Sequence, residues 1–152
     1  MTLTRPTTRQ LDPFVGAWKM TGHAHESPFG PEGDVSADET FDWLTGRQFL
    51  MHRLQGRLGD EDIACVEVLG RDSGGDAFTA HTFYNDGTST RWSLEERDGA
   101  WIMSGQWPKG RDVFNVRCTI TFDDRTHRRG IWEYSTNDSD WQVFWETEAT
   151  RT

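Results

Sequence analysis

Short runs in which apolar and polar residues alternate follow one another along the chain, separated by polar segments that contain Gly, Pro, Asn or Asp. An alternation with a period of two is typical of a β-strand that buries one face. Residues 11–15 are expected to form a short helical turn, since Pro13 suits a first helical turn. The pattern predicts an all-β protein of ten strands, at residues 17–25, 39–44, 47–55, 62–69, 77–84, 88–95, 101–106, 113–122, 130–135 and 141–149.

The segments between these runs are short, and the sequence at residues 85–87, Asn-Asp-Gly, is a strong hairpin signal. A short connection requires neighbouring strands to be antiparallel, because a parallel crossover needs about a dozen residues or more. We therefore expect an up-and-down antiparallel β-barrel of about ten strands, closed so that no edge is exposed. Residues 11–152 are assigned to this single domain, and residues 1–10 to a flexible N-terminal tail.

The chain is rich in large aromatic rings, with eight Trp and nine Phe although only 34% of its residues are hydrophobic. Aromatic side chains bury about 150–250 Å² each, so a few of them can hold a small core together. Most of these rings are expected to replace missing aliphatic residues in the core. The alternative is that some of them line a cavity inside the barrel.

The net charge of −9 and the presence of only two Lys argue against a nucleic-acid partner, which would need clustered basic residues. No run approaches the roughly 20 apolar residues of a membrane-spanning helix, and the first ten residues lack the apolar core of a signal peptide. A cytoplasmic protein with no membrane partner is therefore expected. Cys65 and Cys118 lie inside apolar runs, which favours buried free thiols.

The two ends of the chain carry a further signal, because Gly16-Ala17-Trp18 opens the first strand and Arg151 closes the last. This frame resembles the lipocalin-like barrels of the calycin group. The segments at 41–50 (Phe-x-Trp-Leu-x-Gly-Arg-x-Phe-Leu), 69–72 (Leu-Gly-x-Asp) and 84–87 (Tyr-x-Asp-Gly) resemble the DUF1579 family over about residues 11–151. The resemblance implies a closed barrel in which Trp18 closes one end and stacks under Arg151, and it implies no established activity.

The chain is also similar, more distantly, to the nitrobindin family, whose ten-stranded barrel carries haem. The similarity lies in the Gly-x-Trp opening and in Trp18-x-x-x-Gly22. In that family a His close to the last strand holds the haem iron, whereas no His follows His127 here. We therefore expect no haem and no other cofactor, and strong metal-binding motifs are absent from the sequence.

The histidines are the main candidates for chemistry. Because Trp18 should point inward, alternation places His23 and His25 outside. Either His52 or His81 could face the lumen, where burial disfavours the charged form and the imidazole could serve as an acid or base. His81 is the best catalytic candidate, and an outward position is favoured for His52. Alternation also favours an outward position for Glu133 and Glu146, each of which is adjacent to a Trp.

Three hypotheses for the function remain open. The preferred one is binding of a small apolar or aromatic molecule in the lumen, beneath a Pro- and Gly-rich loop at 27–33 that could form a lid. The second is a small-molecule enzyme of the cyclase, isomerase or decarboxylase type that uses a lumen His. The third is a filled barrel that acts through its outer surface, where a homodimer could form. The expected ligand-binding residues are Trp43, His52, His81, Tyr84, Trp92, Trp132 and Trp145.

Overall fold

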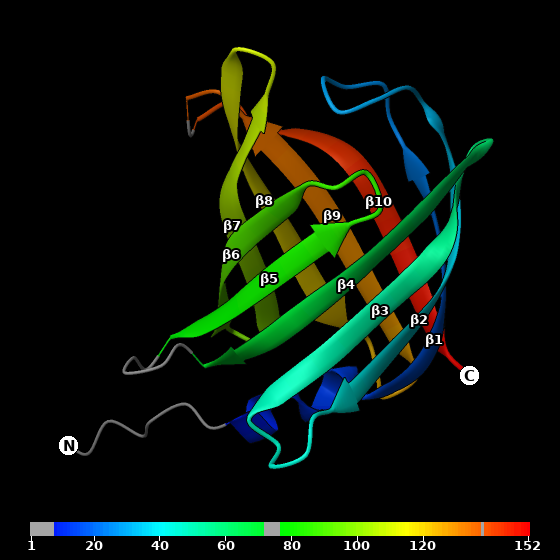
Figure 1. Cartoon of the computed structure of the whole chain (residues 1–152), viewed down its shortest axis with the longest axis vertical. Coiled ribbons are helices and arrows are strands. Elements are labelled where there is room, and N and C mark those ends of the chain that lie inside the picture. Colours follow the sequence, from blue (N-terminus) through cyan, green and yellow to red (C-terminus); the bar gives the residue numbers. More distant parts are fainter. Residues whose placement is uncertain (1–7, 72–76, 138) are drawn as a thin grey trace.

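The computed structural model describes residues 8–71, 77–137 and 139–152, and it shows ten strands and one short 3-10 helix, η1 (Figure 1). Each strand pairs with its neighbours in antiparallel fashion, and β1 pairs with β10, so the sheet closes into a barrel. The predicted fold class is therefore confirmed. The elements are η1 (Thr8–Phe14), β1 (Gly16–Ala24), β2 (Gly33–Trp43), β3 (Phe49–Leu58), β4 (Glu61–Arg71), β5 (Phe78–Tyr84), β6 (Ser89–Arg97), β7 (Ala100–Lys109), β8 (Asp112–Phe122), β9 (His127–Ser135) and β10 (Gln142–Arg151).

Several strands extend beyond the predicted runs. The largest difference is in β2, which begins at Gly33 rather than at residue 39, because Val35 and Ala37 already alternate with exposed polar residues. The helix η1 begins at Thr8, inside the segment assigned to the tail. Residues 1–7 of that predicted tail and residues 72–76, between β4 and β5, lie outside the described part of the chain.

One end of the barrel is closed by η1 and by Trp18, which is almost fully buried and donates its indole N–H to the carbonyl of Phe14 at 2.9 Å. The guanidinium of Arg151 lies 4.3 Å from the Trp18 ring and also donates to the carbonyls of Pro13 and Val15. The expected stacking of Trp18 under Arg151 is thus confirmed. Gly16 has a φ of 130°, and a Cβ there would clash with Arg151 Nη1, so this position requires glycine.

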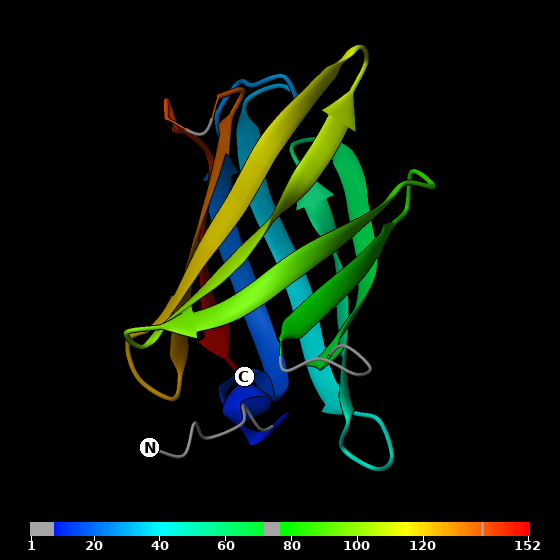
Figure 2. The ribbon, with the colours of Figure 1, turned by 90° about the vertical axis from the view of Figure 1, so that its left-hand side faces the viewer.

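The other end of the barrel is less tightly closed. The loop between β1 and β2, residues 25–32, lies there, opposite η1, and we call it the lid loop (Figure 1). At this end β6 and β7 diverge, because their ladder stops at the pair Ser93 and Ser104 (Figure 2). The fold therefore has a sealed end at η1 and an end where only side chains and one loop cover the interior.

Candidate functional site

The interior contains a layer of charged residues between the sealed end and the lid loop. Glu39, His52 and Glu67 stand on β2, β3 and β4, and each shares the inward face of its strand with buried apolar neighbours. All three are less than 10% exposed. Buried charges are costly unless they are paired and hydrogen-bonded, so this layer must satisfy itself internally.

Hydrogen bonds join these side chains into one network. His52 lies between the two carboxylates, with Nε2 at 3.0 Å from Glu39 Oε1 and Nδ1 at 3.1 Å from Glu67 Oε1. Thr82 of β5 donates to Glu67 Oε2, and Trp92 of β6 donates its indole N–H to Thr82 Oγ1 at 3.1 Å. The network therefore runs around the inner wall across five consecutive strands, β2 to β6.

The ion pairs of this layer set the protonation states of His52 and Glu39. Burial alone would lower the pKa of His52, but the hydrogen bonds and charges of Glu39 and Glu67 outweigh burial and raise it to about 9. Burial alone would raise the pKa of Glu39, but the hydrogen bond from His52 and the charge of Arg128 lower it to about 2. At neutral pH His52 is therefore an imidazolium, and both of its ring N–H groups are donated to carboxylates.

Arg128 completes the charged layer from the opposite side of the barrel. Its side chain, 9% exposed, points inward from β9 and donates through Nη2 to Glu39 Oε2. The guanidinium lies 4.7 Å from the Trp18 ring and 5.3 Å from the Phe41 ring, so it rests on the sealed end of the barrel. Its Nη1 is buried and has no hydrogen-bond partner among the described residues.

A cluster of aromatic rings occupies the lid end of the interior. Phe29 of the lid loop has its ring centroid 4.8–5.6 Å from four other rings, those of Trp107, Phe114, Tyr134 and Phe144. These four residues come from four consecutive strands, β7 to β10. The barrel thus supplies an aromatic cage, and a ring from outside the barrel strands occupies it.

Further rings connect this cage to the charged layer. Trp132 lies 6.3 Å from Phe144 and 5.6 Å from Trp92, whose indole N–H belongs to the network. Tyr84 stacks on Trp107 at 5.4 Å, across the region where β6 and β7 diverge. A continuous column of rings therefore runs from the lid loop to Thr82 and Glu67.

The predicted site residues are distributed over these layers. Tyr84, Trp92 and Trp132 lie in the ring column, and Trp145 pairs with Trp132 next to an irregularity in β10. Trp43 stands apart at the sealed end, where its indole N–H donates to Asp12 at 3.1 Å. The structure therefore brings together most of the predicted aromatic residues and separates Trp43 from them.

Of the two histidines that could face the lumen, the structure places His52 inside the barrel and His81 outside. His81 is on the outer face of β5, opposite to the inward Ala80 and Thr82, and contacts the exposed ring of Phe83 at 4.3 Å. The physical reason is that Ala80 pairs with Trp92, whose ring needs a small neighbour inside the barrel. His52, for which an outward position was favoured, is the histidine in the lumen.

The remaining titratable candidates lie on the outer face, as alternation predicted. His25 pairs with Glu146 at 2.8 Å, and Glu133 pairs with Arg117 at 3.1 Å. His23 likewise lies outside, between Glu32 and Asp34. In the described ranges no group of three metal-ligating side chains is found, and no helix there is long and apolar enough to cross a membrane.

Both cysteines are free, with Cys118 buried and Cys65 half-buried. Burial raises the pKa of the Cys65 thiol to about 12, so this thiol stays protonated at neutral pH. Burial likewise raises the pKa of Cys118. Neither cysteine therefore offers a thiolate nucleophile.

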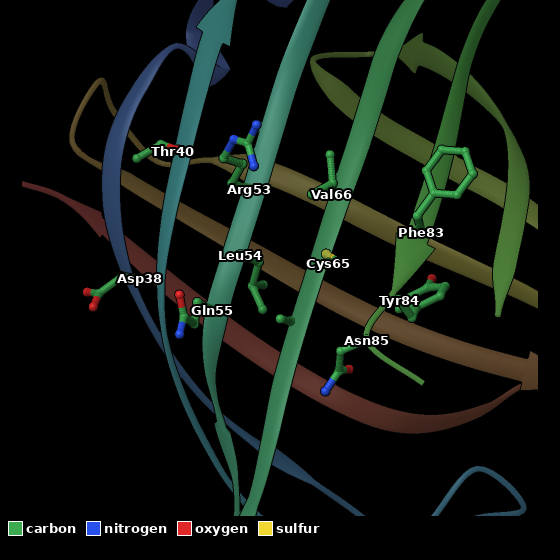
Figure 3. A pocket seen from close by; sticks show the side chains of 11 residues that line it. Asp38, Thr40, Arg53, Leu54, Gln55, Cys65, Val66, Phe83, Tyr84 and Asn85 are labelled. Atoms are coloured by element: carbon green, nitrogen blue, oxygen red, sulfur yellow. The ribbon is translucent and has the colours of Figure 1, made fainter. Parts of the chain in front are cut away.

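Three hollows of the protein are lined mostly by residues outside the ring column. One of about 500 Å³ is lined mostly by outward-facing positions of β2 to β5, including Thr40, Arg53, Val66 and Phe83 (Figure 3). A second of about 780 Å³ lies beside η1, and a third of about 500 Å³ lies against β6 to β8. In this structure the lid end of the interior is thus occupied by the protein's own rings.

Sequence reasoning missed Glu39, Glu67, Arg128 and Phe29. The signal for the charged residues was present, because Glu39 shares its face with Val35, Ala37 and Phe41. Arg128 is likewise two and four residues before the inward Gly130 and Trp132. A charged residue in phase with buried neighbours is the pattern that would have identified this layer.

Comparison with known proteins supports the fold. A family model described as "Protein of unknown function (DUF1579)" matches residues 4–151. The structure is similar to that of Rv2717c from M. tuberculosis, with a TM-score of 0.65 and 13% identity, covering 99% of each chain. It is also similar to the S-type phycobiliprotein lyase CPES from Guillardia theta, with a TM-score of 0.57 and 14% identity, covering 95% of this chain and 91% of the other. A search of curated proteins gave no match.

Proposed function

Since the chain belongs to the DUF1579 family, whose function is unknown, we propose a function from its own residues: it binds a small, mainly aromatic molecule in the lid end of the barrel. The observation that carries this proposal is the position of Phe29. A benzyl side chain from a loop occupies a cage that four barrel strands build. An aromatic ligand would take the place of that ring when the lid loop moves away.

The surroundings of the cage fit this role. Ligand sites in proteins are mostly apolar and contain a few placed polar groups, and the ring column ends on such groups at Thr82 and Glu67. Within the lid loop, Ser27 and Gly30 bond to each other, and His25 at its start donates its backbone N–H to the carbonyl of Phe144 at 2.8 Å. The structural neighbour CPES is by its name a phycobiliprotein lyase, which is compatible with a barrel of this fold holding a small molecule.

The enzymatic alternative receives no specific support from the charged layer. A general acid or base must reach the proton that it transfers. Both ring nitrogens of His52 are bonded to carboxylates, and the carboxylate oxygens of Glu39 and Glu67 all accept hydrogen bonds from the network. The geometry therefore favours a structural role for the charged layer over a role in proton transfer.

We expect the Phe29→Ala variant to bind an aromatic probe more tightly than the wild type. Displacing Phe29 costs free energy, so the apparent affinity is reduced by the fraction of molecules in which the cage is open. Removing the ring abolishes this cost. If displacing Phe29 costs about 1 kcal/mol or slightly more, the affinity for the probe should rise by about fivefold to tenfold. The probe is 6-propyl-2-(dimethylamino)naphthalene, and the measurement is quenching of Trp fluorescence by energy transfer.

Phe83→Ala is the matched control, because Phe83 is 47% exposed and lies on the outer face of β5. This variant should bind the probe as the wild type does. No binding to the wild type and to Phe29→Ala would refute the proposed function. If the wild type and Phe29→Ala bind the probe with equal affinity, the ligand does not compete with the Phe29 ring.

A further inference from the structure

We propose that the ligand of this site is an elongated aromatic molecule whose inner end carries a neutral oxygen acceptor, a carbonyl oxygen, that binds Arg128 Nη1. The inference rests on the proposed function and adds the chemical class of the ligand. Three observations lead to it. Arg128 Nη1 is a buried donor without a partner among the described residues, the charges of the layer balance, and a column of rings leads from the lid loop to this layer.

Hydrogen bonds within the charged layer use donors from four of its side chains. Thr82, Trp92 and both nitrogens of His52 donate within the network, and Arg128 Nη2 donates to Glu39. Arg128 Nη1 is the donor in this layer that has no partner among the described residues. A buried donor without a partner costs free energy, so a ligand that accepts its hydrogen bond gains that amount on binding. The complementary ligand atom is an acceptor.

The charges of the layer indicate that this acceptor is neutral. Glu39 and Glu67 carry two negative charges, and Arg128 and the protonated His52 carry two positive charges, so the layer is balanced. An anionic ligand group would add an uncompensated charge to a buried site, which is expensive. A carbonyl oxygen satisfies Nη1 and leaves the balance unchanged.

The distances between the rings set the shape of the ligand. Ring-to-ring steps of 4.8, 6.3 and 5.6 Å lead from Phe29 through Phe144 and Trp132 to Trp92. On the wall beside Arg128 the inward neighbours are small, with Ala149 directly opposite and Gly130 two residues along. These steps end at Trp92, whose indole N–H belongs to the hydrogen-bond network that contains Arg128. A molecule that enters where Phe29 lies and reaches this layer must therefore extend beyond a single ring, and its inner end must be narrow to lie beside Ala149 and Gly130.

The test compares three probes on one scaffold. They are 6-propionyl-2-(dimethylamino)naphthalene, its 6-propyl analogue without the ketone, and 6-(dimethylamino)-2-naphthoate. Arg128→Lys keeps the positive charge beside Glu39 but lacks the second arm of the guanidinium fork. Arg129→Lys is the matched control, because Arg129 is exposed and pairs with Glu148 on the outer face. Dissociation constants come from quenching of Trp fluorescence.

We expect the preference of the wild type for the ketone over the propyl probe to fall by about tenfold in Arg128→Lys and to stay unchanged in Arg129→Lys. The naphthoate should bind at least about tenfold more weakly than the ketone. If Arg128→Lys does not fold, the pair Glu39→Leu and Arg128→Met, which removes one charge of each sign, should lose the preference in the same way.

Two results would overturn the inference. One is a ketone preference that is the same in the wild type and in Arg128→Lys while the propyl probe still binds, and this result leaves the proposed function intact. The other is a naphthoate that binds more tightly than the ketone, which would assign an anionic ligand. If none of the three probes binds, the proposed function fails and the inference fails with it.

Discussion

Replacing Glu39 with Gln should lower the free energy of unfolding by about 3–5 kcal/mol, because it leaves Arg128 and His52 with only one buried carboxylate to balance two positive charges. Asp38→Asn is the matched control: Asp38 is adjacent on β2, exposed on the outer face and paired with Lys19. Its effect should stay below about 1 kcal/mol. Urea unfolding at pH 7, followed by Trp fluorescence, measures both variants.

The double variant Glu39→Leu with Arg128→Met separates the loss of charge balance from the loss of packing. It removes one charge of each sign and leaves the pair of His52 and Glu67, so the layer stays neutral. Replacing a buried ion pair with apolar residues is often close to neutral in stability. The double variant should therefore be at least about 2 kcal/mol more stable than Glu39→Gln. If Glu39→Gln costs less than about 1 kcal/mol, the charged layer does not hold these strands together.

The architecture could be predicted because it depends on features that are local in sequence. Short connections force antiparallel neighbours, and the Gly16-Ala17-Trp18 opening and Arg151 lie together when the sheet closes. Strand bounds were less predictable. Residues 33–38 of β2 contain Gly, Asp and Ser, which have low strand propensity, and only their pairing with β1 and β3 makes them a strand.

The site could be predicted only in part, because it depends on which face of each strand is inside. In β5 the aromatic residues Phe78 and Phe83 have opposite phases, so alternation alone does not select the face of His81. The structure selects it through contacts from other strands, since Thr82 donates to Glu67 and Ala80 accommodates Trp92. The sequence of β5 alone does not reveal these contacts with other strands.

We expect the free energy of unfolding to fall by about 3 kcal/mol between pH 6 and pH 9.5, because of His52. Its pKa is about 9 in the folded protein against an ordinary value of 6.5, so the folded state binds the proton more tightly than the unfolded chain. A raised pKa gives stability that is complete below pH 6.5 and is lost as the pH rises through 9. Urea unfolding at a series of pH values measures this dependence.

At low pH the free energy of unfolding should also fall, because of Glu39. The pKa of Glu39 is about 2 in the folded protein and lies below its ordinary value of 4.5. That contribution is complete above pH 4.5 and is lost as the pH falls toward 2, so this layer is most stabilising between pH 4.5 and 6.5. His52→Gln should flatten the alkaline limb of the curve. His81→Gln, the matched control on the outer face, should leave it unchanged.

Imidazole NMR resonances provide the direct measurement, since the His52 signal should titrate near pH 9. A His52 signal that titrates near 6.5 would show that the carboxylates do not hold the proton. The layer would then carry a net negative charge at pH 7, and the expected loss of stability between pH 6 and pH 9.5 would be absent.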